Sequence, residues 1–143
     1  MSKRSERQAI IREIVREREV WTQQELVELL ETRGHACTQA TVSRDITEMG
    51  LERHSEGGYA LPEDLHLHRM LSDLMTSVAR ANNLVVVKCR SGAGASVGAA
   101  IDGAALAGIL GSIAGDDTIL LICQTDKVGE NVVSHLERFR KLE

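Results

Sequence analysis

Two adjacent aspartates, Asp116 and Asp117, stand in the middle of an apolar stretch of the sequence. The flanking residues, 109–114 and 118–123, are mostly aliphatic and predict two buried strands. Only a short turn separates them, so we expect a tight hairpin that carries both carboxylates. Like charges this close repel each other, and a partner cation would explain why both stay ionised. A solvent-exposed turn explains the same composition, because aspartate is a common turn residue.

A second chemically distinctive pattern lies on a helix that we expect to begin at Thr38, a residue type that caps helices. Val42, Ile46 and Met49 have the spacing of a buried helix face. Arginine and glutamine side chains can contact base edges in the major groove of DNA, and short hydroxyls can reach phosphates. The rest of this helix offers such groups: Gln39, Thr41, Ser43, Arg44 and Thr47. A helix face that is simply solvated would have the same composition.

The glycine-rich segment before the hairpin matches two enzyme motifs by spacing alone. Ser96 lies in a GxSxG string, and Asp117 and His135 follow in the order of a hydrolase triad. That motif needs a large sheet behind the serine, and too little chain follows Ser96 to build one. A dinucleotide-binding loop needs a parallel sheet, whereas a tight turn joins antiparallel strands. The glycines that suggest this loop are Gly92, Gly94 and Gly98. We instead interpret the small residues of this segment as allowing a helix over about 94–106 to approach its neighbours closely.

Histidine and cysteine do not form a metal-binding pattern in this sequence. His66 and His68, with Glu63 and Asp64 nearby, are too few to complete a metal site. The cysteines are isolated and odd in number, which predicts buried thiols in a reducing cytoplasm: Cys37, Cys89 and Cys123. The charged start of the chain and the lack of a long apolar run predict neither export nor a membrane span.

The composition changes near the only proline, Pro62. Residues 1–62 are rich in charged side chains, whereas residues 84–123 are dominated by Val, Ile, Leu, Ala and Gly. The chain has 143 residues, enough for two small domains, and we predict a boundary near Pro62. Both halves are slightly acidic, so the overall charge favours solubility and does not indicate a nucleic-acid partner.

Capping signals predict two helices before the polar one. Ser5 with Gln8 forms one capping box, and Thr22 with Glu25 forms another. Gly34 is placed to end the second helix. Each helix has an apolar face for a shared core, formed by Ile10, Ile11, Ile14 and Val15 in the first and by Leu26, Leu29 and Leu30 in the second.

A short hairpin is predicted directly after the polar helix. Residues 51–54 and 59–61 can pair across Ser55-Glu56-Gly57-Gly58. Three helices followed by a hairpin form a winged helix-turn-helix, in which the third helix enters the groove and the wing runs along the DNA backbone. Because this half is slightly acidic, its affinity for DNA must come from a local basic patch, which we expect to contain Arg44, Arg53 and the N-terminal Lys3, Arg4 and Arg7.

The C-terminal half predicts a small antiparallel sheet covered by two helices. Residues 84–87 read as an apolar strand, in addition to the two strands of the aspartate hairpin. The first helix is the glycine-rich one. The second is expected over about 129–142, and its apolar side chains would cover the sheet: Val132, Val133, Leu136 and Phe139.

Two separate strings carry a resemblance to one family. Residues 38–46, TQATVSRDI, resemble the recognition helix of the bacterial arginine repressor family, and residues 111–119, GSIAGDDTI, resemble the signature of its ligand-binding domain. The resemblance covers nearly the whole chain. It implies an α+β fold with an N-terminal winged helix-turn-helix over 1–62, a linker over 63–75, and over 76–143 an arginine-binding and oligomerisation domain with a small antiparallel sheet and two helices.

The resemblance also implies a function. The protein would be a hexamer, a dimer of trimers, that binds paired operator half-sites in double-stranded DNA and represses arginine biosynthesis genes. L-arginine would be the co-repressor, bound between trimers. By the family's pattern, Asp116 and Asp117 hold the cationic groups of the ligand, as carboxylates can accept a guanidinium in bidentate fashion. The resemblance places four more residues at this ligand site: Asp102, Ser112, Ala114 and Thr118.

The sequence departs from the family's pattern at two ligand positions. Where the family usually has Pro-Gly-Asn-Ala-Gln, this chain has Ser91-Gly92-Ala93-Gly94-Ala95, so that Ala95 replaces the glutamine that would contact the ligand. Ser112 stands where a threonine is usual. We expect both departures to affect the strength of arginine binding.

Two other function classes remain as alternatives. One is a DNA-binding regulator that senses a different cationic effector or a metal. The other is a nucleotide-dependent or hydrolytic enzyme, which the Ser96 and glycine patterns suggest. We predict a regulator without catalytic residues. Calorimetry with L-arginine and with citrulline, which lacks the guanidinium charge, distinguishes these classes.

Overall fold

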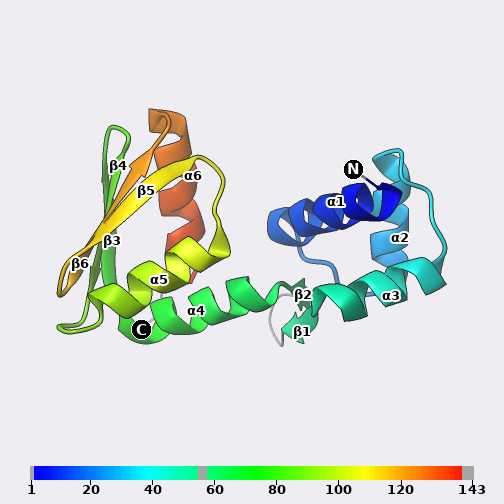
Figure 1. Cartoon of the computed structure of the whole chain (residues 1–143), viewed down its shortest axis with the longest axis horizontal. Helices are drawn as coiled ribbons and strands as arrows, with labels where there is room; N and C mark the ends of the chain where they lie inside the picture. The colour runs from blue at the N-terminus through cyan, green and yellow to red at the C-terminus, as the bar shows by residue number, and fades with distance from the viewer. Residues whose placement is uncertain (1, 55–57, 140–143) are drawn as a thin grey trace. The chain divides into compact units, whose positions relative to one another are not determined.

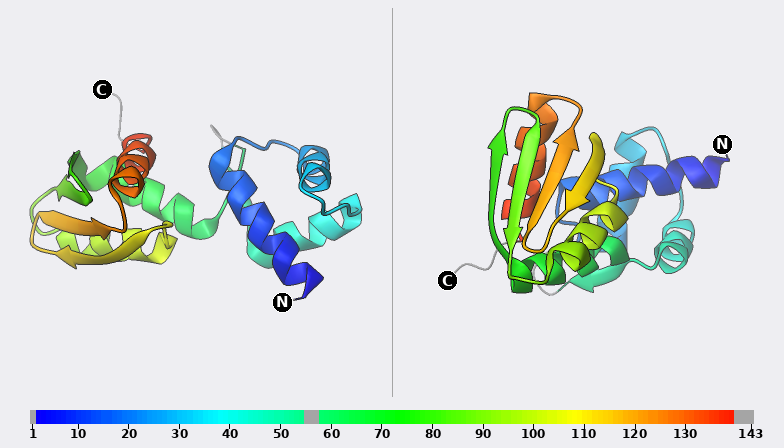
Figure 2. Two further views of the ribbon diagram at one scale, coloured as in Figure 1. Left: turned by 90° about the horizontal axis from the view of Figure 1, so that it is seen from above. Right: turned by 60° about the vertical axis from the view of Figure 1, so that its left-hand side comes forward.

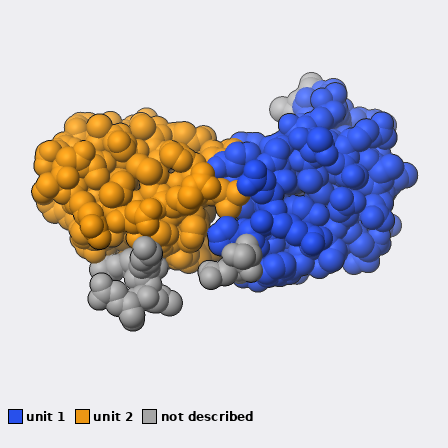
Figure 3. Space-filling model, turned by 90° about the horizontal axis from the view of Figure 1, so that it is seen from below, with its two compact units in different colours: residues 1–62 blue, residues 63–143 orange. Residues whose placement is uncertain are grey.

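The computed structural model describes residues 2–54 and 58–139 of the chain (Figure 1). The chain divides after Pro62 into two compact units, residues 1–62 and 63–143, which Figure 3 colours separately. Each unit has its own cluster of buried apolar side chains. Among the described residues, no helix is both long enough and apolar enough to span a bilayer.

The described part of the first unit consists of three helices and a two-stranded hairpin, in the predicted order. These elements are α1 (Lys3–Glu17), α2 (Gln23–Thr32), α3 (Gln39–Met49), β1 (Glu52–His54) and β2 (Gly58–Ala60). The strands are antiparallel, with Arg53 opposite Tyr59. Of the predicted turn, Ser55, Glu56 and Gly57 lie outside the described residues.

Side-chain caps begin these helices. The Thr22 and Thr38 hydroxyls accept the backbone N–H groups of Glu25 and Thr41 at 3.1 and 3.2 Å, which confirms both predicted starts. The first helix begins earlier than predicted, because Ser2 is its cap and accepts the N–H of Ser5 at 3.1 Å. Ser5 is itself inside the helix, since a cap one turn earlier adds a further hydrogen-bonded turn.

The core of the first unit joins all three helices to the hairpin. Most of its buried side chains come from the predicted apolar faces of α1 to α3, and Tyr59 and Leu61 complete it. The other residues of those faces are partly buried against it: Ile10, Val15, Leu29 and Met49. The hairpin is also tied to the segment between α1 and α2, because the Tyr59 N–H donates to the Val20 carbonyl at 2.8 Å. A Cβ on Gly58 would lie 2.2 Å from that carbonyl oxygen, so this approach requires glycine.

The second unit has an antiparallel sheet in the order β3-β4-β6-β5. Within residues 62–139 the elements are α4 (Pro62–Leu74), β3 (Met75–Ala81), β4 (Leu84–Cys89), α5 (Gly94–Ala104), β5 (Ile109–Ala114), β6 (Thr118–Cys123) and α6 (Asp126–Glu137). One face of β4 and β6 is buried, with Val85 paired to Leu121 and Val87 to Ile119. This face packs in one core with side chains of α4, α5 and α6, and α6 lies behind the sheet in the right-hand view of Figure 2.

The predicted linker over 63–75 is wrong, because most of this range is helix α4. Leu67 and Leu71 lie one helical turn apart and are fully buried in the second core. Pro62 is the first residue of the helix, where its missing N–H costs nothing, and Glu63 and Asp64 occupy the positive end. The helix therefore belongs to the packed structure rather than to a connector.

The remaining differences concern strand burial and element ends. Strand β5 is an edge strand rather than a buried one: Leu110 and Ile113 are 65% and 67% exposed. Strand β3 was not predicted, because only Met75 and Val78 among its residues have large apolar side chains. The last helix begins at Asp126, earlier than predicted, because the Thr125 hydroxyl caps it by accepting the Val128 N–H at 3.1 Å. The end of the predicted range, residues 140–142, lies outside the described residues.

Candidate functional sites

The first candidate site is the polar face of α3. Gln39, Arg44 and Thr47 are exposed, whereas Thr41 and Ser43 are half-buried. The Thr41 hydroxyl lies 3.0 Å from that of Thr38, and the Thr47 hydroxyl donates to the Ser43 carbonyl at 3.2 Å. Among the described residues, Arg44 makes no side-chain hydrogen bond or ion pair. The face therefore offers a free guanidinium between short hydroxyl side chains.

Arg53 projects from the predicted wing and is exposed. Its guanidinium carbon lies 5.4 Å from the ring centroid of Tyr59, the residue opposite it on β2. The positive group and the negative ring face attract each other at this distance. The strand pair thus holds Arg53 while leaving its charge accessible to solvent.

Two N-terminal members of the predicted basic patch have carboxylate partners, and their contact with DNA stays a prediction. Arg7 of α1 hydrogen-bonds to both oxygens of Asp45 on α3, and Arg4 lies 2.7 Å from a Glu48 oxygen. Asp45 is only 1% exposed, and its importance was missed. The sequence does hold a signal: Asp45 falls on the apolar stripe of α3, and a charged residue at a core position requires a partner.

The second candidate site is the turn between β5 and β6, and the predicted tight hairpin is confirmed. The Gly115 N–H donates to the Thr118 carbonyl at 2.7 Å, and the side chains of Asp116 and Asp117 are exposed. The turn is fixed from two sides. The Asp117 carbonyl accepts the Cys89 N–H, and the Asp116 carbonyl accepts the Gly94 N–H, both at 2.9 Å.

Gly94 explains how the first turn of α5 reaches this hairpin. A Cβ at Gly94 would lie 1.8 Å from the carbonyl oxygen of Gly115, so only glycine permits the contact. The glycine-rich segment therefore packs closely, as predicted. Ser96 lies inside α5 and not on a strand-to-helix turn, and the sheet is antiparallel, so neither enzyme motif has the structural context that its chemistry needs.

Side chains of the predicted ligand set form two small clusters. In one, the Ser112 hydroxyl donates to an Asp102 carboxylate oxygen at 2.7 Å, which links β5 to α5. In the other, the Thr118 hydroxyl donates to Asp117 at 2.8 Å and accepts from the Lys88 ammonium at 2.7 Å. Lys88 was missed by the sequence analysis, because its contact depends on the pairing of β4 with β6.

The other two predicted ligand residues are Ala114, the last residue of β5, and Asp116, in the turn that follows it. Ala114 is exposed and would contact a Cβ at Gly98 at 3.2 Å, so it sits against α5. Asp116 makes no side-chain hydrogen bond or ion pair with the residues that the structure describes. Ala95, which stands where the resemblance predicts a glutamine, is exposed in the first turn of α5. The β5–β6 turn thus carries two exposed carboxylates, and the adjacent first turn of α5 carries no polar side chain at position 95.

Cysteines and other metal-binding side chains add no site in the described ranges. Cys89 and Cys123 are buried free thiols, and burial raises the pKa of both. Cys37 is only partly buried. No group of three or more His, Cys, Asp or Glu side chains is placed to hold a metal ion in residues 2–54 and 58–139.

Comparison with known proteins assigns the family. The sequence model of the arginine repressor DNA binding domain matches residues 2–67, and that of the arginine repressor C-terminal domain matches residues 71–138. The arginine repressor of Halalkalibacterium halodurans is 42% identical over 95% of this chain and 96% of its own length. Those of Carboxydothermus hydrogenoformans and Bacillus subtilis are 39% and 37% identical, each over 93% of this chain and 96% of the relative. The chain therefore belongs to the arginine repressor family: it is a DNA-binding transcriptional regulator of arginine metabolism with arginine as its effector, and not an enzyme.

Proposed function

We propose that this protein acts in the cytoplasm as a hexamer, a dimer of trimers, which L-arginine enables to bind paired operator half-sites and repress arginine biosynthesis genes. Residues 1–62 would read the DNA, and residues 76–143 would bind arginine and form the oligomer. The observation that carries the arginine site is the exposed carboxylate pair of Asp116 and Asp117 on a turn whose backbone is fixed by hydrogen bonds.

The DNA interface uses α3 and the β1–β2 hairpin. Arg44 is exposed and without a partner among the described residues, so its guanidinium is available for a base edge or a phosphate. The side chains of Gln39, Thr41, Ser43 and Thr47 would contact bases and backbone beside it. Arg53, held against Tyr59, would contact a phosphate from the wing.

The arginine site uses the β5–β6 hairpin and α5. Asp116 and Asp117 would accept the cationic groups of the ligand, and a guanidinium matches a carboxylate in bidentate fashion. Asp102, Ser112, Ala114 and Thr118 would complete the site. The carboxylates of Asp116 and Asp117 are exposed in a single chain, and exposed ion pairs contribute little binding free energy. A second copy that covers the site would exclude water and strengthen the contacts, which supports a position between subunits.

Strand β5 supports the proposed oligomer. It lies at the edge of the sheet, and its Leu110 and Ile113 side chains are 65% and 67% exposed. Natural proteins usually protect an edge strand that exposes large aliphatic side chains, because it would otherwise pair with other chains. Burial of β5 between copies of this chain satisfies that requirement.

Calorimetry and sedimentation test the proposal together. The full-length chain is titrated with L-arginine and with citrulline, and its mass is measured with and without each compound. We expect L-arginine alone to bind and to favour the hexamer, because citrulline lacks the charge that Asp116 and Asp117 would neutralise. Equal binding of both compounds would exclude the carboxylate pair as the recognition element.

A further inference from the structure

Helix α3 carries acidic side chains, although phosphate contacts are the main source of affinity for DNA and require positive charge. Glu48 is partly exposed, but Asp45 is 1% exposed and lies among the apolar side chains of the first unit. Removing a carboxylate from water is unfavourable unless it is paired and hydrogen-bonded. Asp45 therefore requires a structural explanation that the proposed function has not yet supplied.

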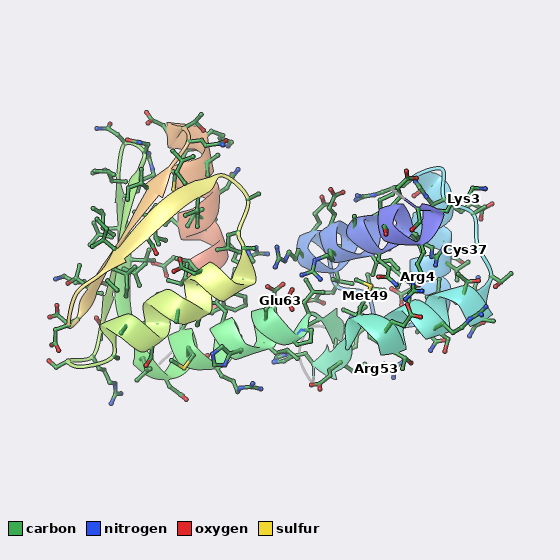
Figure 4. All side chains as sticks on the ribbon, in the orientation of Figure 1. Lys3, Arg4, Cys37, Met49, Arg53 and Glu63 are labelled. Atoms are coloured by element: carbon green, nitrogen blue, oxygen red, sulfur yellow. The ribbon has the colours of Figure 1, made fainter. Side chains whose placement is uncertain are left out.

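Helix α1 supplies the partners of both carboxylates. Arg7 donates from Nε and Nη2 to the two oxygens of Asp45, with Nη2 3.0 Å from Oδ1. The Gln8 amide donates to Asp45 at 3.0 Å and to Glu48 at 2.9 Å. Arg4, which lies between α1 and α3 in Figure 4, reaches the same Glu48 oxygen at 2.7 Å. Two cations thus balance two anions within the helix pair.

The geometry of this contact restricts how α3 can rotate about its own axis. A bidentate guanidinium and carboxylate pair fixes direction as well as distance, whereas apolar contacts are not directional. Ser43 and Thr47 are each two positions from Asp45, which corresponds to roughly 200° of rotation in opposite senses. Both therefore lie nearly opposite Asp45, on the side of α3 that faces away from α1.

We infer that Asp45 is the positioning residue of the DNA-binding unit: through Arg7 and Gln8 it sets the rotation of α3 and so aims Ser43, Arg44 and Thr47 at the DNA. Arg7 serves Asp45 and does not contact DNA phosphates. This inference rests on the proposed use of α3 in the groove. Its ion pair persists at neutral pH. Burial opposes ionisation of Asp45, but the hydrogen bonds from Arg7 and Gln8, together with the charges of Arg7 and Arg4, outweigh it and the pKa of Asp45 is lowered.

The test replaces the ion pair by apolar side chains of similar size, in the double variant Arg7→Met/Asp45→Leu of the full-length chain. Such replacements of buried ion pairs often leave folding intact. The probes are a duplex selected by the wild-type chain from random sequences and a shuffled duplex of the same composition, both with L-arginine present. Dissociation constants, their salt dependence and the melting temperature are measured.

We expect the double variant to bind the selected duplex about tenfold more weakly, which corresponds to the loss of one good base contact. Its affinity for the shuffled duplex and its salt dependence should stay the same, because no phosphate contact is removed. A variant that only loses stability would not lose this sequence preference. Unchanged preference in a folded double variant would overturn the inference. If the slope of the logarithm of affinity against the logarithm of salt concentration instead decreased in magnitude by about one, Arg7 would be assigned to a phosphate.

Further variants keep the result interpretable. If the double variant does not fold, Arg7→Lys replaces it, because lysine keeps the charge but lacks the planar fork and should also reduce the preference. An unchanged preference in Arg7→Lys would then overturn the inference. The matched control is Arg33→Gln/Glu17→Gln, which removes an exposed ion pair of the same unit outside the proposed DNA interface and should have little effect. Arg44→Ala tests the proposed function separately: if it leaves binding unchanged, the placement of α3 fails rather than the role of Asp45.

Discussion

The two units use carboxylates in opposite ways. In the first unit, Asp45 is buried and its oxygens are bonded to Arg7 and Gln8. In the second, Asp116 and Asp117 are exposed on a turn, and the turn is held by its backbone rather than by these side chains. The first arrangement uses the charge to join two helices. The second leaves charge available for a cation from outside the chain.

A carboxylate that stabilises the fold can thus be distinguished from one that is available to bind a ligand. A carboxylate that is buried must be satisfied within the fold, so its loss affects stability first. An exposed carboxylate on a rigid turn contributes little to folding, so its loss affects binding first. Substitutions of the same chemical kind in the two units should therefore have different consequences.

The largest effect is expected from Asp45→Asn. The amide keeps the shape but leaves the Arg7 guanidinium without its counter-charge, and the first unit should lose about 3 kcal/mol of unfolding free energy. Denaturant unfolding followed by circular dichroism measures this loss. Asp116→Asn is the matched control and should leave the unfolding free energy unchanged. Equal losses in both variants would remove the distinction between the units.

The next largest effect is expected on arginine binding rather than on stability. Asp117→Asn should weaken L-arginine binding by about 1.5–3 kcal/mol, the range for a hydrogen bond to a charged group. Isothermal calorimetry on the full-length chain measures this change, with Asp45→Asn as the control at a temperature where it stays folded. Wild-type arginine affinity in Asp117→Asn would show that the hairpin carboxylate does not hold the ligand.

Acid should lower the stability of the wild type more than that of Asp45→Asn. Because the pKa of Asp45 is lowered in the folded state, its stabilising contribution is present above the unfolded value of about 3.9 and is lost as the pH falls below it. The Arg7 guanidinium stays charged throughout, because its hydrogen bond to Asp45 raises its pKa. Arg4 and Glu48 lie beside this pair. The stability difference between wild type and Asp45→Asn, measured in urea from pH 7 to pH 3, should shrink below about pH 4. A difference that stays constant would contradict the assignment.

The smallest effect concerns the departure at Ala95. This residue is exposed in the first turn of α5, next to the hairpin that Gly94 contacts. Ala95→Gln should strengthen arginine binding by about 0.5–1.5 kcal/mol, since it supplies a polar group where the family usually has one. Calorimetry gives the affinity, and Ala99→Gln, at another exposed position of α5, is the control. No gain would mean that the site is complete without this side chain.

Local signals explain what the sequence predicted well. Thr22 and Thr38 cap helices, and a three-residue turn at Gly115 gives an antiparallel hairpin, because each depends on residues within a few positions. The helix α4 was missed because its leucines gain stability only from a core built elsewhere in the chain. The link between Arg7 and Asp45 joins residues 38 positions apart, and no local pattern specifies it.

The candidate ligand site shows the same division. Asp116 and Asp117 could be selected from their own neighbourhood, since two like charges in an apolar segment are unusual. The contact of Ser112 with Asp102 depends on how β5 packs against α5, and that of Lys88 with Thr118 depends on the strand order. Composition alone cannot give either contact, because each is set by tertiary packing.

The hydrogen bond from Gly94 to the aspartate turn has a consequence for the energetics of ligand capture. A flexible loop loses conformational entropy when it closes on a ligand, and this loss weakens binding. The turn of Asp116 and Asp117 is already held by α5 and by the end of β4 before any ligand arrives. In the proposed site, little ordering entropy would then be lost at this turn on binding, so that a small amino acid with few contacts could still bind with useful affinity.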